Sequence, residues 1–394
     1  MKRSTASRVD LFTESVIREM TRITNLHNGI NLAQGFPDFD APAELIEAAV
    51  EALRAGWNQY AITWGSPRLR RAVADKMAWA NGVTIDPERH ITVTCGATEA
   101  MMATLLAVVD PGDEVVIFEP FYENYGPDAL LSGARLRYVR LHLDDQAMPF
   151  NPGELRAAFG PNTRAIVVNT PHNPTGKVFT EAECATLLDL CRRHDCLLVA
   201  DEVYEHLTFE GARHVTPAAL DRERVLRLGS ASKTFSVTGW KIGWACGPAP
   251  ATEGVRRAHQ FLTFCAASPL QEAVAHALRE APARGYYASF QADYALRRAA
   301  VLQALTGAGL HPFAPDGTYF VMADYRALGE EEDTAFAARL VRERGVAAIP
   351  PRSFYEHPEH GRHLLRFAFC KSVETLEEAG RRLAGGAGRA FSGS

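Results

Sequence analysis

Short apolar runs alternate with longer stretches of helical periodicity between about residues 90 and 250 of this 394-residue chain. In residues 98–109 and 181–194, apolar side chains recur at three- and four-residue spacing, which predicts amphipathic helices. The runs between such stretches are short and rich in apolar and β-branched residues, which predicts buried strands. The expected strands are residues 91–95, 114–119, 135–141, 165–169, 197–201, 225–229 and 242–246.

This alternation is typical of βαβ units, in which helices cover both faces of a mostly parallel sheet. The connection between the last two expected strands is too short for a crossover helix, so these two strands are expected to pair antiparallel. The pattern therefore predicts an α/β fold with a seven-stranded, mostly parallel sheet between helices and one antiparallel strand.

The two ends of the chain show a different pattern. One helical run in the first 45 residues precedes an extended segment, residues 31–39, that is punctuated by Gly and Pro. After about residue 295, a long helix is followed by expected strands at 317–322, 346–349 and 364–369 and by helices near 334–344 and 373–384. We therefore expect a large domain of residues 46–294 and a smaller α+β domain made of residues 1–45 and 295–394.

The composition argues against several classes of protein. Hydrophobic residues make up 47% of the chain and charged residues 23%, which is typical of a globular protein. A net charge of -5 disfavours a nucleic-acid-binding surface, because such a surface needs a basic field. No apolar stretch reaches the roughly 18 residues that span a bilayer. We expect a cytoplasmic protein without nucleic-acid or membrane partners.

The seven cysteines are an odd number and show no Cys-x-x-Cys spacing. Most of them lie in apolar runs of the sequence. Reduced, buried thiols are therefore expected rather than disulfides or a zinc site, and no metal site is predicted.

The most specific candidate chemistry directly follows the expected strand 225–229. Lys233 stands among Ser230, Ser232 and Thr234, and a second lysine, Lys241, follows eight residues later, in a chain with only six lysines. A lysine flanked by small hydroxyl residues and a second cation suits a Schiff base to a phosphorylated aldehyde, with Ser230 and Lys241 holding the phosphate. A solvated lysine at the end of a strand is the alternative.

Polar and aromatic side chains also follow other expected strands, and ligands of open α/β sheets gather beyond the carboxyl ends of strands. Ala97 and Thr98 open a helix whose N-terminus suits a phosphate, although Thr98 also suits a helix cap. Tyr122 suits stacking on a flat ring, or packing in the core. Asn173 stands in an Asn-Pro turn that fixes the direction of its amide.

Two charged residues stand in apolar strands and need partners. Asp201 ends the expected strand 197–201, and a buried carboxylate is costly unless it meets a cation such as a pyridinium N–H. Tyr204, three residues later, is within reach of the phenolic oxygen of such a ring. Arg366 interrupts the last apolar strand, where its guanidinium suits a substrate α-carboxylate or a structural salt bridge.

Five motifs occur in the order of a known family. They are NLAQGFPDF at 31–39, NTPHNPTGK at 169–177, DEVY at 201–204, GSASKTF at 229–235 and LLRFAF at 364–369. On these motifs, which span nearly the whole chain, the protein resembles the fold-type I pyridoxal-phosphate enzymes of the class I/II aminotransferases. Within that family it resembles kynurenine/glutamine transaminases and bacterial methionine aminotransferases, with which it shares QY at 59–60, EPFY at 119–122 and GWKIGW at 239–244.

The resemblance implies a homodimer with shared active sites and a role for each candidate residue. Lys233 would carry pyridoxal 5'-phosphate and act as general base, and Asp201 would pair with the ring nitrogen. Asn173 and Tyr204 would bond the 3-oxygen of the ring, on which Tyr122 would stack. The residues implied for the phosphate are Ala97, Thr98, Ser230, Lys241 and, from the other subunit, Tyr60. The residues implied for the substrate are Gly35, Trp64, Asn173, Phe264 and Arg366, the last of which would bind the α-carboxylate with Asn173.

The segments expected around the substrate side chain contain aromatic and sulfur-bearing residues but no lysine or arginine. They are residues 35–36, 60–64, 122–125 and 264–265. Because an acidic side chain would need a second cation, we expect an apolar, aromatic or sulfur-containing amino acid of the methionine, glutamine or kynurenine kind. Its amino group would pass to a 2-oxo acid in a ping-pong reaction. Thr98 and Cys265 differ from kynurenine transaminases, which often have tyrosine and can have histidine at these positions.

Several alternatives share this fold. A cysteine-S-conjugate β-lyase would use the same site, and an aspartate-type aminotransferase becomes possible if an arginine arrives from the partner subunit. A regulator carrying such a domain would need a basic DNA-binding segment, which the first 30 residues do not supply. A decarboxylating, acyl-condensing synthase matches the contexts of Arg366 and Asn173 less well.

Overall fold

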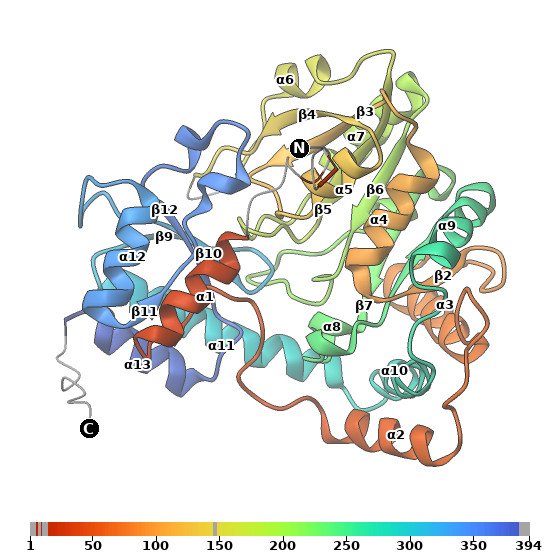
Figure 1. Cartoon of the computed structure of the whole chain (residues 1–394), viewed down its shortest axis with the longest axis horizontal. Coiled ribbons are helices and arrows are strands. Elements are labelled where there is room, and N and C mark those ends of the chain that lie inside the picture. The colour runs from red at the N-terminus through yellow and green to blue at the C-terminus, as the bar shows by residue number, and fades with distance from the viewer. Residues whose placement is uncertain (1–4, 7–8, 10–14, 145–147, 386–394) are drawn as a thin grey trace.

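The computed structural model describes residues 5–6, 9, 15–144 and 148–385, and a seven-stranded sheet forms its centre (Figure 1). Its strands are β2 (Ile91–Thr94), β3 (Glu114–Glu119), β4 (Arg135–Arg140), β5 (Thr163–Asn169), β6 (Leu197–Asp201), β7 (Val225–Ser230) and β8 (Gly243–Cys246). They lie in the order β2-β8-β7-β6-β5-β3-β4. β8 runs antiparallel to β7 and β2, and the other neighbouring pairs are parallel. The predicted sheet with its one antiparallel strand is confirmed, with strand ends shifted by one or two residues.

Helices cover both faces of this sheet because successive residues of a buried strand point to opposite sides. In β3, Val115 and Ile117 pack with apolar residues of the helices on one face, whereas Val116 and Phe118 pack with Leu187 and its neighbours on the other. The first face carries α4 (Gly96–Val108), α5 (Tyr125–Leu131) and α9 (Ala249–Leu262), and the second carries α6 (Pro152–Ala157) and α7 (Glu181–His194). A third group of helices, α2 (Ala43–Arg54), α3 (Pro67–Asn81) and α10 (Ser268–Glu280), packs beside the β2–β8 edge.

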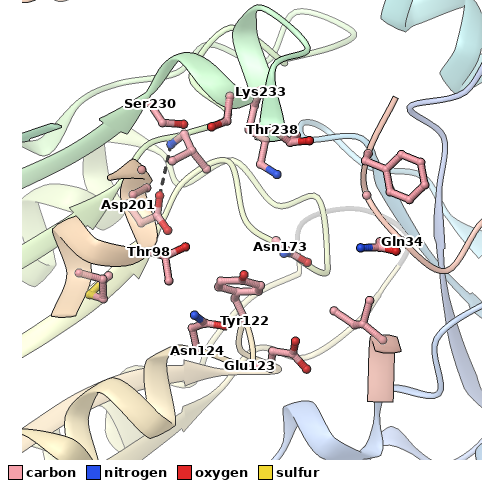
Figure 2. A pocket seen from close by; sticks show the side chains of 18 of the residues that line it. Gln34, Thr98, Tyr122, Glu123, Asn124, Asn173, Asp201, Ser230, Lys233 and Thr238 are labelled. Atoms are coloured by element: carbon pink, nitrogen blue, oxygen red, sulfur yellow. Dashed lines mark hydrogen bonds between the residues drawn. The ribbon is translucent and has the colours of Figure 1, made fainter. Parts of the chain in front are cut away.

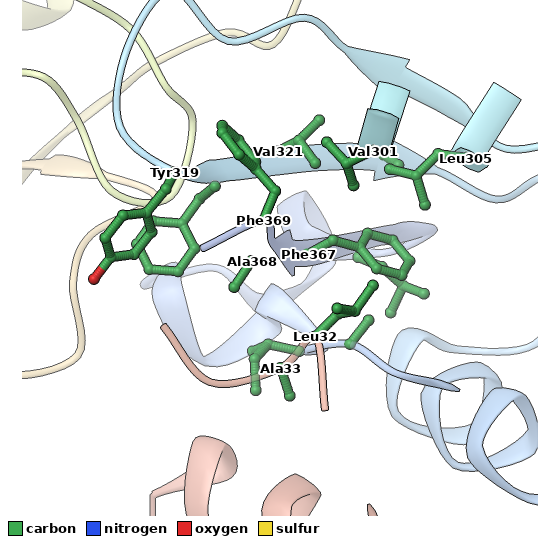
Figure 3. Packing of buried hydrophobic residues seen from close by; sticks show 14 of the residues in the cluster. Leu32, Ala33, Val301, Leu305, Tyr319, Val321, Phe367, Ala368 and Phe369 are labelled. Carbon is green, nitrogen blue, oxygen red and sulfur yellow. The ribbon is translucent and has the colours of Figure 1, made fainter. Parts of the chain in front are cut away.

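A second group of strands joins the two ends of the described chain. β1 (Ile30–Asn31) pairs in parallel with β11 (Val346–Ala347), and β10 (Phe320–Asp324) lies between β9 (His311–Phe313) and β12 (Leu364–Ala368) in an antiparallel sheet. Around them lie α1 (Val16–Leu26), α11 (Tyr286–Gly307), α12 (Asp333–Arg344) and α13 (Val373–Leu383). Figure 3 shows Val301 and Leu305 of α11 packed beside Val321 and Phe367 of this sheet. The domain boundaries at residues 46 and 294 stay a prediction.

Short helices fill several connections. They are α8 (Ala231–Thr234), η2 (Pro217–Ala219), η3 (Arg222–Arg224), η4 (Thr238–Trp240), η5 (Pro351–Phe354) and η6 (Pro358–Gly361). Within the described residues, no helix combines the length and the apolar character needed to cross a membrane. All seven cysteines are free thiols, and five of them are buried.

Candidate active site

A cavity of about 710 Å³ lies beyond the carboxyl ends of the central parallel strands. Asn169, Asp201 and Ser230, the last residues of β5, β6 and β7, all line it. Its other walls come from α1, from the segment around Gly35 and from β12 (Figure 2). The segments far apart in sequence that carry the candidate motifs therefore meet at one place.

Lys233 reaches this cavity from α8, the single helical turn that follows β7. Its amine projects into the cavity, opposite Tyr122 (Figure 2). Its Nζ lies 5.9 Å from the centre of the Tyr204 ring and 5.7 Å from that of Tyr319. Burial, with a smaller contribution from the nearby Lys241, lowers the pKa of Lys233 to about 8. This lysine is therefore not a solvated strand end, and a larger fraction of it than of an ordinary lysine is the neutral nucleophile near neutral pH.

Asp201 is a buried carboxylate that no described cationic side chain neutralises. It is 7% exposed and forms no ion pair with another described residue. Its Oδ2 accepts a hydrogen bond of 2.6 Å from the hydroxyl of Tyr125, and its Oδ1 accepts one of 3.3 Å from the Val203 N–H. Burial raises the pKa of Asp201, whereas the bond from Tyr125 opposes that rise. A carboxylate in this environment fits a bound group that brings a cationic N–H.

Arg366 is a buried guanidinium whose charge no described carboxylate neutralises. It is 1% exposed, and it donates to Asn173 Oδ1 at 3.0 Å and to the Ala33 carbonyl at 3.1 Å. Its Nε is buried and has no hydrogen-bond partner among the described residues. The structural salt bridge considered from the sequence is therefore absent from the described part, and the site fits a planar anion such as an α-carboxylate.

The first turn of α4 and Lys241 form a cradle suited to a phosphate. Lys241 Nζ donates to Thr98 Oγ1 at 3.2 Å, and Ala97 and Ser230 also line the cavity. Gly96 has a φ of +78°, and a Cβ built there would lie 3.2 Å from Lys241 Cε and Nζ. Thr98 does not cap α4, since Cys95 is the residue at that position. Free N–H groups, the helix dipole and a lysine together favour a bound dianion.

The aromatic residues of the cavity frame a space for a flat ring. Tyr122 lines the cavity, and its ring lies across the cavity from Lys233 (Figure 2). Tyr204 is buried, and burial raises the pKa of its hydroxyl well above the ordinary value, so that it stays a hydrogen-bond donor. Gly35 also lines the cavity, where a Cβ would come within 2.6 Å of the Phe320 ring. No larger side chain fits at residue 35 unless Phe320 moves.

Three predicted site residues do not reach this cavity within one chain. Tyr60 is 82% exposed and meets the edge of Phe264 with ring centroids 5.2 Å apart. Trp64 packs against Arg256, whose guanidinium carbon lies 5.0 Å from the Trp64 ring centre. Trp64 and Phe264 do not line the cavity of their own chain, and their place in the substrate site stays a prediction. Tyr60 was expected from the other subunit.

Sequence reasoning missed some contacts and residues of the cavity. It placed Tyr125 near the substrate but missed that Tyr125 binds Asp201, 76 positions away, since no motif marks that contact. Arg18 and Thr21 of α1 line the cavity together with Gln34. The expectation of a substrate pocket without lysine or arginine is corrected by Arg18. Helical periodicity predicted that α1 exists, but it could not show which face of α1 meets the cavity.

The comparison with known families agrees with this geometry. The family described as aminotransferase class I and II matches residues 27–383. The chain belongs to this family. Its members depend on pyridoxal phosphate, so this aminotransferase is a pyridoxal-phosphate-dependent enzyme. The residues described above fit that cofactor, since they offer an amine with a lowered pKa, an unpaired buried acid and an anion cradle.

Several relatives share most of the length of the aminotransferase. The probable N-succinyldiaminopimelate aminotransferase DapC of Mycobacterium tuberculosis is 42% identical over 390 residues, which cover 96% of this chain and 98% of the relative. The methionine aminotransferase of Escherichia coli is 38% identical, covering 94% and 95%. Kynurenine–oxoglutarate transaminase 1 of Mus musculus is 36% identical, covering 93% of each chain. A solved structure of the M. tuberculosis N-succinyldiaminopimelate aminotransferase superposes with a TM-score of 0.94, covering 98% of this chain and 100% of that one.

Proposed function

We propose that this aminotransferase transfers the α-amino group of an L-amino acid with a long, uncharged side chain to a 2-oxo acid. The observation that carries the proposal is the unneutralised Arg366, held by Asn173 in the same cavity as Lys233. This pair suits an α-carboxylate, and binding it there fixes the amino acid by the group common to all amino acids. The rest of the cavity is then left for the side chain.

The proposed roles follow from the contacts of each residue. When bound, pyridoxal phosphate supplies an aldehyde for the substrate amine and a ring that takes up the electron pair released at Cα. Neutral Lys233 would accept the α-proton on Nζ, and Asp201, whose carboxylate accepts a hydrogen bond from Tyr125, would hold the proton on the ring nitrogen. Asn173 and Tyr204 would bind the 3-oxygen, and Tyr122 would stack on the ring. Ala97, Thr98, Ser230 and Lys241 hold the phosphate.

Methionine, glutamine and kynurenine-like amino acids are the proposed donors. The names of the relatives from E. coli and M. musculus support methionine and kynurenine. The name of the M. tuberculosis relative adds a second candidate, N-succinyldiaminopimelate, and Arg18 at the cavity wall favours it by offering a cation for a distant carboxylate. A β-lyase acting on cysteine S-conjugates remains an alternative activity of the same site.

A panel of half-reactions tests the donor. The holoenzyme is mixed with single amino acids, and the loss of cofactor absorbance is followed. We expect kcat/KM for methionine, glutamine or kynurenine to exceed that for aspartate, because a second carboxylate needs a second cation and an uncharged side chain does not. Aspartate as the best donor, or pyruvate and ammonia from a cysteine conjugate as the main products, would contradict the proposal.

We propose a homodimer in which each subunit completes the site of the other. Tyr60 and its neighbour Phe264 are 82% and 44% exposed, and exposed aromatic side chains in contact with each other are typical of interfaces. Tyr60 is the residue proposed to reach the partner's phosphate. The partner's Tyr60 would be supported there by Phe264, its edge-on neighbour in the same chain.

Subunit mixing tests this arrangement. Tyr60→Ala dimers are expected to have reduced activity and Lys233→Ala dimers to be inactive, yet hybrid dimers should regain activity. In a hybrid, the subunit that keeps Lys233 receives Tyr60 from the other subunit, so that one intact site forms per dimer. Exchange is followed with a mass tag. A fully active monomer, or no regained activity after proven exchange, would rule the shared site out.

A further inference from the structure

The wall of the cavity formed by α1 carries a cation that is free to bind a ligand. Arg18 lines the cavity, its side chain is exposed, and it forms no ion pair with any described residue. Arg22, one turn later on the same helix, differs because its guanidinium donates to both carboxylate oxygens of Glu19 at 2.6 and 2.9 Å. Arg18 is therefore the arginine of α1 that is both at the cavity and available to an anion.

Contacts at the start and in the middle of α1 hold the helix in place. The hydroxyl of Ser15 donates to both oxygens of Glu123 at 2.8 and 3.0 Å, and Thr21 Oγ1 donates to Gln34 Oε1 at 3.1 Å. Glu123 and Gln34 both stand at the cavity (Figure 2). Glu123 is the one acid among these neighbours, and its carboxylate is engaged by Ser15. The backbone of Arg18 thus has a defined place relative to the cavity.

A ping-pong aminotransferase must bind two different substrates in one cavity. Arg366 binds the α-carboxylate of either substrate, so a second carboxylate on one of them needs a second cation. Arg18 offers that cation with little energetic penalty for binding the substrate that lacks a second carboxylate. Because its side chain is exposed, the guanidinium stays hydrated when a neutral side chain occupies the cavity, and no charge is buried unpaired.

We propose that Arg18 determines specificity for a dicarboxylic 2-oxo acid as the amino-group acceptor, by binding its distal carboxylate. Neutral amino acids use the same cavity without this contact. The inference rests on the proposed function and deepens it, since it names the residue that selects the second substrate.

The test compares two acceptors on the pyridoxamine form of the holoenzyme, 2-oxoglutarate and the neutral 4-methylthio-2-oxobutyrate. Arg18→Met keeps the length of the side chain and removes its charge. We expect this change to raise KM for 2-oxoglutarate roughly 3- to 5-fold, as for loss of an exposed ion pair. KM for the neutral acid should stay within about twofold. Arg18→Lys should restore part of the affinity, and Arg22→Met should change neither acceptor.

Salt dependence gives a second readout. Added salt should raise KM for 2-oxoglutarate in the wild-type enzyme, because an exposed ion pair is screened. In Arg18→Met, added salt should leave this KM unchanged. An equal rise in KM for both acceptors in Arg18→Met, or no rise for either, would overturn the inference. A different outcome separates the two proposals. If the wild-type enzyme does not accept methionine as a donor, yet Arg18→Met raises KM for 2-oxoglutarate, the proposed donor is refuted and the inference stands.

Discussion

Lys233→Ala is expected to lower kcat by at least about 10⁴-fold, while the protein still folds and binds pyridoxal phosphate without a covalent bond. The change removes both the amine that attaches the cofactor and the base that accepts the α-proton. The phosphate cradle with Lys241 and Thr98 and the carboxylate of Asp201 stay in place, so binding persists. Single-turnover rates and cofactor retention after gel filtration measure the two effects separately.

Labelling of the wild-type protein checks the same assignment. Borohydride reduction of the holoenzyme should fix the cofactor on Lys233, and Lys177, which pairs with Glu183 at 2.7 Å, should stay unlabelled. In the apoprotein, the rate of attachment should rise with pH and level off above about 8, because the neutral amine is the nucleophile and burial lowers the pKa of Lys233 to about 8. Label on another lysine, or a rate still rising at pH 10, would show that the assignment is wrong.

Much of the site was predictable because parallel strands end at a common edge. Asn173, Asp201 and Lys233 each follow a strand of the predicted βαβ series, and β5, β6 and β7 are neighbours in the sheet. Identifying strands from apolar runs was therefore enough to bring these side chains together. Arg366 was predictable for another reason, since a lone arginine in an apolar strand needs an anion.

The residues that escaped prediction depend on how separate elements dock. The contact of Tyr125 with Asp201 arises where the start of α5 meets the end of β6, and Arg18 reaches the cavity through the packing of α1. Neither arrangement is encoded in local periodicity. Trp64 and Phe264 lie away from the cavity of their own chain, and local sequence patterns do not indicate which subunit of a dimer such a segment serves.

Arg227→Met is expected to lower the free energy of unfolding by about 3–5 kcal/mol, because it leaves two buried carboxylates short of a cation. Arg227 is fully buried on β7, and its guanidinium donates to Glu202 at 2.8 Å and to Glu205 at 2.6 Å. Lys76 also pairs with Glu205, and His214 contacts Glu202 at 2.8 Å. Urea denaturation of the apoprotein at neutral pH measures the loss.

The sign of the pH dependence follows from the same contacts. Burial alone would raise the pKa of Glu205, but Arg227 and Lys76 hold it well below its ordinary value. Burial likewise opposes a lowered pKa at Glu202, and Arg227 overcomes it. Carboxylates with lowered pKa values stabilise the wild-type protein above the ordinary glutamate pKa of about 4.3, and that contribution is lost as the pH falls below it. Arg227→Met should remove most of this acid-dependent step.

An exposed ion pair provides the control. Arg193 pairs with Asp189 at 2.5 Å on α7, with 65% and 50% of the two side chains exposed, so Arg193→Met should cost no more than about 1 kcal/mol. If both substitutions cost the same small amount of unfolding free energy, the buried network is not what stabilises this part of the fold.

A large, specific effect of Arg227 has a consequence for the active site. Glu202 and Glu205 are the chain neighbours of Asp201 and Tyr204, so the network that stabilises the fold also sets the position of two residues proposed to bind the cofactor.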